Sequence, residues 1–410
     1  MTTSVAAFPQ RRTLTVLAAS QVVGGIGNGA GLAVGALLVR DVSGSSGWAG
    51  TATVALTLGA ALATLPLASL AARHGRRPAL TIGWLIGAAG AAVVVLGAEL
   101  VSLTIVLAGL ALFGVSTAAS LQSRFAATDR ADPRTVGRSL SLVVWAMTIG
   151  AVAGPNLTGP GAALGRATGL PELAGPALFS LVAFAAAGIL TLIALRPDPL
   201  TRTTGDPSHE RLGMRGALGH LRGPAATAVL AIGTAHAVMV AVMALTPVHM
   251  QDHGSDLQVI GLTISLHIAG MFALSPVMGA LADRWGPART ILLGQLVLVA
   301  AVTVAGTSGH SDVQITVGLV LLGIGWSATV IAGAALLTRS VDPQVRTALQ
   351  GVSDMVMSLS GAAGGLLAGL VVAWWGFGAL NAAAGTLVIP VVLLILAGRR
   401  VARQVGAGAR

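Results

Sequence analysis

Methionine and histidine side chains recur at helical spacing in two apolar stretches of the second half of the chain. His236, Met239 and Met243 fall on one face of a helix, and His267 and Met271 share a face of the next apolar stretch. Thioether sulfur and imidazole nitrogen are soft ligands of the kind that Cu(I) prefers. Met239-x-x-x-Met243 together with His267-x-x-x-Met271 therefore predicts a copper site.

Packing is the alternative interpretation of the same methionines. Methionine fills irregular apolar gaps, and helices rich in small residues leave such gaps. Five of the nine methionines after Met1 lie in these two stretches or, in the case of Met250, just after the first, which is more than even placement along the chain would give. The sequence leaves both interpretations open.

One acid, Asp354, lies well inside an apolar stretch, whereas the other acids fall in loops or at helix ends. Ionisable groups within a membrane span are costly and are treated as functional by default. Asp354 therefore predicts a site that couples transport to protons. The alternative is an ion pair with a loop arginine such as Arg73 or Arg76, and the two roles are compatible.

The composition identifies the elements that must position these residues. Of the 410 residues, 54% are hydrophobic and 9% are charged, whereas an ordinary soluble domain carries about 25% charged residues. The chain is therefore expected to be an integral membrane protein. This excludes soluble enzymes and nucleic-acid binders in spite of the net charge of +10. The absence of cysteine excludes disulfides and thiolate metal sites.

Twelve apolar stretches have the length of about 20 residues that a transmembrane helix needs. They lie near residues 14–38, 48–72, 79–98, 103–123, 139–160, 176–195, 225–247, 258–282, 290–307, 315–337, 349–372 and 377–397. With both termini in the cytoplasm, 22 of the 24 arginines fall on the inner side, and only Arg40 and Arg166 fall outside. The bias predicts a multi-pass protein of the inner (plasma) membrane and accounts for the net charge.

The two halves of the chain resemble each other. Leu70–Gly75 matches Leu281–Gly286 at an offset of 211, and Gly150-x-x-x-Gly154 matches Gly361-x-x-x-Gly365 at the same offset. A polar stretch separates the halves. We expect a six-helix bundle over residues 1–195, a cytoplasmic linker over 196–223 and a second six-helix bundle over 224–410. Such six-plus-six repeats are typical of transporters.

The loops after the second and eighth spans resemble the signature G-x-L-A-D-R-x-G-R-R of the major facilitator superfamily. The second copy keeps Asp283, Arg284 and Gly286. The first copy has Ala72 in place of the acid and keeps the residues Arg73, Gly75 and Arg76. The resemblance implies that these loops help to latch the cytoplasmic side shut. Positive charge that only sets the topology is the alternative.

Two further motifs resemble branches of this superfamily. Gly150, Gly154, Pro155 and Gly159 resemble the G-x-x-x-G-P motif of proton-driven drug exporters, although close helix packing explains such glycines equally well. The methionine and histidine pattern is similar to that of the superfamily's copper importers.

The resemblance implies an all-α membrane protein with twelve helices in two pseudo-symmetric six-helix bundles. It also implies a monomeric secondary transporter, not an enzyme, that works by alternating access and has no cofactor. We expect it to export small amphiphilic molecules coupled to protons, and copper uptake is the alternative. Its partners would be a small-molecule or metal-ion substrate and membrane lipid. The polar residues expected to line the substrate cavity are Asn28, Gln122, Asn156 and His236.

Overall fold

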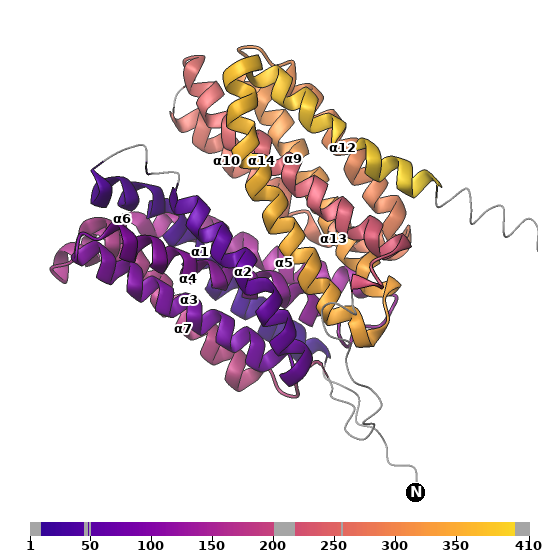
Figure 1. Ribbon diagram of the computed structural model, residues 1–410, viewed down its shortest axis with the longest axis horizontal. Coiled ribbons are helices and arrows are strands. Elements are labelled where there is room, and N and C mark those ends of the chain that lie inside the picture. Colours follow the sequence, from indigo (N-terminus) through magenta and orange to yellow (C-terminus); the bar gives the residue numbers. More distant parts are fainter. Residues whose placement is uncertain (1–9, 45–47, 49–50, 201–217, 256, 398–410) are drawn as a thin grey trace, which may run out of the picture. The chain divides into compact units, whose positions relative to one another are not determined.

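The computed structural model describes residues 10–44, 48, 51–200, 218–255 and 257–397. The chain divides into two compact units, Met1–Glu210 and Arg211–Arg410, whose boundary lies within the predicted linker. Each unit is a bundle of helices, and the colours of Figure 1 run from indigo at the start of unit 1 to yellow at the end of unit 2.

Unit 1 contains seven α-helices and two short 3₁₀ helices among its described residues. They are α1 (Gln10–Ser43), α2 (Thr51–His74), α3 (Arg76–Glu99), α4 (Leu103–Ala126), α5 (Val136–Ala153), η2 (Pro155–Leu157), α6 (Thr158–Ala167), η3 (Glu172–Ala174) and α7 (Gly175–Ala194). The main elements of unit 2 are α9 (Gly223–Asp252), α10 (Leu257–Phe272), α11 (Ser275–Arg284), α12 (Pro287–Gly306), α13 (Asp312–Ser340) and α14 (Pro343–Thr386).

These helices account for the predicted membrane spans. Nine helical segments of the described part are long and apolar enough to cross a membrane. One of them, Pro343–Ala397, holds two predicted spans, because Gly376 leaves the helical conformation at φ 79° and ψ 175°. α5 is apolar but shorter, and α1 occupies the first predicted span. The two spans of Pro343–Ala397, the other eight segments, α1 and α5 together make twelve helices, which is the predicted number.

Two predicted spans are interrupted where the sequence contains proline. The span predicted over 139–160 ends as α5 at Ala153, and Pro155 opens a short 3₁₀ turn. The span predicted over 258–282 is divided into α10 and α11, with Pro276 in the first turn of α11. Proline has no backbone N–H and clashes with the preceding turn, so a helix bends or ends before it.

Small residues let the helices of unit 1 close around large aromatic rings. Trp84, Phe113 and Phe184 are buried, with ring centroids 5.8 Å apart for Trp84–Phe184 and 4.8 Å apart for Phe113–Phe184. A Cβ atom at Gly27 would lie only 2.7 Å from Cε1 of Phe184. The glycine therefore lets α1 approach this aromatic core, which holds α1, α3, α4 and α7 together.

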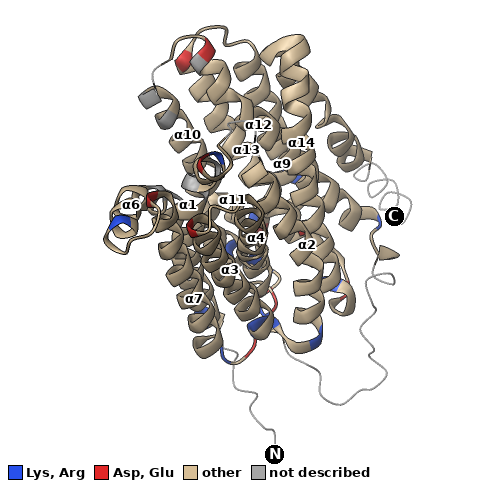
Figure 2. Cartoon of the chain, turned by 60° about the vertical axis from the view of Figure 1, so that its left-hand side comes forward, with Lys and Arg blue, Asp and Glu red and all other residues tan. Residues whose placement is uncertain are grey.

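A mutual glycine contact brings α12 and α13 together in unit 2. A Cβ atom at Gly294 would lie 2.9 Å from the Gly325 carbonyl oxygen, and one at Gly325 would lie 2.9 Å from the Gly294 oxygen. Van der Waals contact between closely approaching backbones is a main source of helix association in membranes. Figure 2 shows that charged residues gather at helix ends and connecting segments, whereas the spans are almost free of them. The polar clusters described next lie at such helix ends.

Candidate functional site

A buried ion pair joins the start of α3 to the segment after α4 in unit 1. Arg76 Nε donates to Asp129 Oδ2 at 2.8 Å, and its terminal nitrogen donates to Oδ1 at 3.2 Å. The two side chains are 1% and 2% exposed. Two parallel hydrogen bonds between guanidinium and carboxylate give both strength and a fixed orientation. Arg76, a predicted latch residue, thus has a partner that the sequence analysis did not identify.

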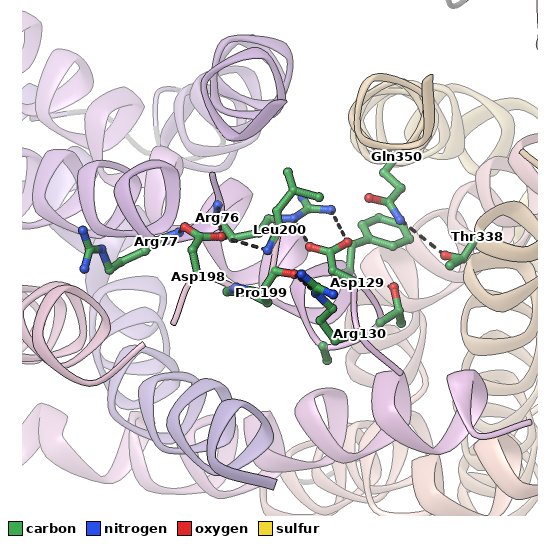
Figure 3. A network of polar contacts seen from close by, with 12 residues as sticks. Arg76, Arg77, Asp129, Arg130, Asp198, Pro199, Leu200, Thr338 and Gln350 are labelled. Carbon is green, nitrogen blue, oxygen red and sulfur yellow. Dashed lines mark hydrogen bonds and ion pairs between the residues drawn. The ribbon is translucent and has the colours of Figure 1, made fainter. Parts of the chain in front are cut away.

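A second acid, Asp198, caps the first turn of α3 from beyond the end of α7. Its carboxylate accepts hydrogen bonds from the backbone N–H groups of Arg76 at 3.0 Å, Arg77 at 2.8 Å and Leu200 at 2.9 Å. The first N–H groups of a helix have no partner within the helix. The cap residue of α3 is Gly75, which has no side chain to supply one. Figure 3 shows Asp198 beside this helix start.

Gly75 is required at this position for two reasons. Its φ of 101° lies in the region that favours glycine. A Cβ atom there would also lie 2.8 Å from Asp198 Cγ, in the space that the carboxylate occupies. Nearby, Arg130 Nε donates to the Pro199 carbonyl oxygen at 3.2 Å. The segment after α7 is therefore tied to both the α2–α3 turn and the end of α4.

In unit 2 an ion pair also holds the corresponding helix ends, but the positions of the acid and the base are exchanged. Asp283, at the end of α11, accepts a hydrogen bond from Arg339 at the end of α13 at 2.6 Å. The Asp283 side chain is 4% exposed. Gly286 precedes α12 with a φ of 88° and so repeats the turn made by Gly75. The other predicted latch arginines, Arg73 and Arg284, are exposed.

The repeat relates the two ion pairs with their charges exchanged. Asp129 corresponds to Arg339 at an offset of 210. The charged residue near the end of the fourth span is therefore an acid in the first half and a base in the second half. The acid missing at Ala72 in the first motif is balanced by a base, Arg76, four residues later. Unit 1 therefore keeps a connection between the α2–α3 turn and α4 without the signature acid.

The helix 5 motif lies against α1. A Cβ atom at Gly154 would lie 2.5 Å from Gly29 Cα, and one at Gly150 would lie 2.6 Å from the backbone nitrogen of Ile26. The glycines therefore serve the close helix contact that was one of the two interpretations. Pro155 begins η2 directly after α5, and Gly159 in α6 borders open space.

The polar residues predicted to line a cavity in unit 1 lie in different surroundings. Asn28 is half-buried on α1, and its side-chain oxygen accepts from Ser116 Oγ on α4 at 2.9 Å. Gln122 is 2% exposed and donates to the Thr64 carbonyl oxygen on α2 at 3.0 Å, so it joins α2 to α4. Asn156 is exposed in η2.

The four predicted copper ligands come from α9 and α10 of unit 2. Met239 and Met271 are buried, and Met243 is half-buried. His267 is fully buried, and its Nδ1 lies 2.7 Å from the Leu319 carbonyl oxygen on α13. Its Nε2 has no hydrogen-bond partner among the described residues. Within the described ranges, no three His, Cys, Asp or Glu side chains group as metal ligands.

The remaining predicted residues, His236 and Asp354, lie on α9 and α14. His236 Nδ1 accepts a hydrogen bond from Trp326 Nε1 on α13 at 3.0 Å. Asp354 is fully buried, eleven residues beyond Pro343, which places it about 16 Å along the helix. Its backbone oxygen accepts a hydrogen bond from Ser358 Oγ at 3.0 Å.

Together, two apolar helical repeats with polar clusters at their helix ends and isolated polar residues within their spans define a multi-pass membrane transporter. The chain belongs to the major facilitator superfamily, whose family model matches residues 17–258 and 227–409. The expected fold class, twelve helices in two six-helix bundles, is confirmed. Members of this family carry small molecules across membranes as secondary transporters, and the chain is not an enzyme.

Individual relatives cover nearly the whole chain. It is 39% identical over 395 residues to the uncharacterized MFS-type transporter YddS of Bacillus subtilis (strain 168), a match that covers 93% of this chain and 90% of the relative. It is 30% identical over 391 residues to the riboflavin transporter RfnT of Brucella anthropi, covering 94% of each. The human organic anion transporter MFSD10 shares the fold, with a TM-score of 0.75, 19% identity and coverage of 95% and 100%.

Proposed function

We propose that this transporter exports small amphiphilic organic molecules in exchange for protons. The observation that carries the proposal is Asp354, an acid buried about 16 Å along α14 in a chain with almost no charge in its spans. An acid in such a position is functional by default. The export direction is supported by the resemblance of the Gly150–Pro155 motif to that of proton-driven exporters.

The coupling follows from how a buried acid responds to its surroundings. Burial disfavours a charged carboxylate, and a nearby positive charge or hydrogen-bond donor favours it. An acid whose surroundings change between two conformations binds its proton with different affinity in each. That difference in affinity is the coupling free energy between proton binding and the conformational change. Neutralising Asp354 removes the difference.

The arginine-rich helix ends are proposed to lie in the cytoplasm, together with both termini. This orientation follows the arginine bias of the sequence in a protein of the inner membrane. In each unit the ion pair at that end fixes the turn between the second and third spans of the half. The turns are then rigid parts that move with their own bundle. We propose that the transporter works as a monomer.

The class of solute is supported by a relative. RfnT, at 30% identity over most of both chains, is a riboflavin transporter, and riboflavin is a planar amphiphilic molecule. A solute of this general kind, small and partly apolar, suits spans that offer few polar groups. Asn28 and His236 are the half-buried polar residues that we propose contact it.

Inverted membrane vesicles test the proposal directly. Vesicles that hold the transporter are acidified inside by respiration, and a pH-sensitive dye reports proton release when a solute is added. We expect solute-dependent proton release with the parent chain and none with Asp354→Asn, although the variant should still exchange solute downhill. Glu172→Gln is the matched control, since Glu172 is an exposed acid paired with Arg166. Gradient-driven accumulation by Asp354→Asn would contradict the proposal.

Copper uptake is the second candidate, and His267 is the observation that favours it. Its Nδ1 lies 2.7 Å from a carbonyl oxygen, so Nδ1 carries the proton and donates it. The lone pair of the buried Nε2 is then the one that has no hydrogen-bond partner in the part of the chain that the structure describes. Metal-binding histidines commonly donate their other ring N–H to a carbonyl or carboxylate in this way. Met271, four residues further along α10, supplies a thioether on the same face.

Cellular copper content distinguishes the two candidates. Replacing Met243 and Met271 with leucine preserves volume and should cost less than about 1.5 kcal/mol of stability. If copper is the cargo, the double variant should accumulate much less copper than the parent, and His267→Leu should be at least as severe. Met357→Leu, a buried methionine on α14, is the matched control. Equal copper content in all four strains would assign these methionines to packing.

A further inference from the structure

Three of the eight histidines of the chain form one continuous contact at an end of unit 2. His249 lies in the last turn of α9 and His253 directly after that helix, and their ring centroids are 4.2 Å apart. His310, in the connection between α12 and α13, lies edge to face with His253 at a centroid distance of 4.5 Å. We call these three residues the histidine cluster. Neither of the functions proposed above uses it.

The histidine cluster joins three parts of unit 2, because it also reaches α14. The ring of His249 stacks on that of Phe377, with centroids 4.2 Å apart and an interplanar angle of 12°. Phe377 is 5% exposed and directly follows Gly376, where α14 leaves the helical conformation. His249 is half-buried, whereas His253 and His310 are exposed. Protons can therefore reach the cluster from solvent, and its inner ring connects it to the break in α14.

A positive charge on His249 fits this arrangement poorly. Its Nε2 is buried and has no hydrogen-bond partner among the described residues. A protonated imidazole carries an N–H group on both nitrogens, so protonation leaves a buried donor unpaired, which costs free energy. The nearby Nδ1 of His253 does not accept a bond from this ring. It lies 2.7 Å from the His249 carbonyl oxygen and donates to it, since a carbonyl can only accept.

The charged and titratable groups around His249 determine the sign of the pH dependence. Burial and the neighbours His253 and His310 oppose a positive charge on its ring, whereas the Gly309 backbone and Asp252 favour one. On α14, which supplies the stacked phenylalanine, residues 355–386 include no titratable side chain. Two protonated rings in contact repel each other. Acid therefore opposes the contacts that hold the cluster together.

We propose that the histidine cluster is a pH-sensitive contact between α9, the α12–α13 connection and the break in α14. Uncharged rings pack against one another and hold the three parts together, and protonation of more than one ring separates them. In the orientation proposed above, α9 ends on the outer side of the membrane, so the pH outside the cell acts on the cluster. The inference goes beyond the proposed function, because these protons bind at helix ends and not at Asp354.

Hydrogen–deuterium exchange of the purified, full-length transporter in detergent tests the inference. The backbone N–H groups of His253 and Ser255 bond to carbonyl oxygens of α9, and those of Ser308 and Ser311 bond within the α12–α13 connection. Exchange is compared at about pH 7.5 and about pH 5.5, on either side of the ordinary titration of histidine, after division by the intrinsic rate at each pH. We expect these amides to lose about tenfold protection at the lower pH for each proton that the closed contact excludes.

Removing the middle ring of the cluster should remove the response to pH. His253→Asn keeps an amide N–H donor near the position of Nδ1 and lacks the imidazole. We expect the Ser308 and Ser311 amides of this variant to have nearly equal protection at the two pH values. His74→Asn, at an exposed histidine that ends α2 in unit 1, is the matched control and should respond like the parent. Phe377→Leu removes a contact but no titratable group, so it should lower protection by a similar factor at both pH values.

The possible results separate this inference from the proposed function. Equal protection of the parent at the two pH values, or a response in His253→Asn as large as that of the parent, would overturn the inference. His310→Asn, at an exposed position, is the second variant if His253→Asn does not elute as folded protein, and it should also reduce the response. Proton release in the vesicle assay depends on Asp354. It can therefore persist when the cluster shows no response, and the cluster can respond when the vesicles show no release.

Discussion

Arg76–Asp129 and Arg166–Glu172 are two ion pairs of unit 1 with the same nitrogen–oxygen separation and very different burial. Each joins a nitrogen and an oxygen 2.8 Å apart. The first pair is 1% and 2% exposed, and the second is 57% and 56% exposed. We expect Asp129→Asn to destabilise the protein strongly and Glu172→Gln to have little effect.

The magnitudes follow from desolvation. Removing one partner of a buried ion pair leaves a charge without compensation, which costs about 3–5 kcal/mol. An exposed pair contributes about 0–1 kcal/mol, because water solvates both ions. For a unit of roughly 200 residues, 1 kcal/mol corresponds to about 2–4 °C in the midpoint of thermal unfolding. Asp129→Asn should therefore lower the midpoint by about 6–20 °C, and Glu172→Gln by less than about 4 °C.

Thermal unfolding in detergent, followed by size-exclusion chromatography of heated samples, measures both shifts. A double variant adds a second check. Arg76→Met combined with Asp129→Leu removes both charges, and a buried pair replaced by apolar residues of similar size is often neutral in stability. The double variant should thus be more stable than Asp129→Asn alone. Equal midpoints for Asp129→Asn and Glu172→Gln would refute the assignment of a buried, energetically important pair.

Three further predictions each test one contact. Asp198→Ala should lower stability by about 1–3 kcal/mol, since three N–H groups lose a charged acceptor, and a midpoint like that of the parent would contradict the cap. Gly154→Ala should disrupt the α1–α5 contact, because its Cβ would lie 2.5 Å from Gly29 Cα, whereas Gly159→Ala borders open space and should elute as folded protein. Asp283→Asn should slow transport without lowering expression, and unchanged transport kinetics would leave this loop only a role in topology.

The spans could be predicted from the sequence, because each depends on the hydrophobicity of one continuous segment. The interruptions could not be placed as well. Pro155 and Pro276 lie within stretches that remain apolar, so hydropathy alone continues across them. The structure divides both stretches where proline removes a backbone donor. Local chemistry, not hydrophobicity, sets these boundaries.

The candidate site was predictable only in part, because the partner of each predicted residue lies far away in the sequence. The motif identified Arg76, but its partner Asp129 is 53 residues away, and the capping Asp198 is 122 residues away. His236 was identified as an isolated polar residue, whereas its partner Trp326 is 90 residues away. No spacing rule connects such residues. Arg196-Pro197-Asp198-Pro199, an acid directly after an apolar helix, was the available signal for the cap.

The exchange of charges between the halves explains why the first motif seemed incomplete. Compared residue by residue, Ala72 stands where Asp283 stands in the second half, which suggests a lost connection. A Coulomb interaction is unchanged when the two signs are exchanged. Arg76 with Asp129, and Asp283 with Arg339, therefore join equivalent parts of the two units with opposite polarity. The repeat preserves the ion pair and not the identity of its two residues. The two copies of the motif therefore correspond when each charged residue is compared together with its partner.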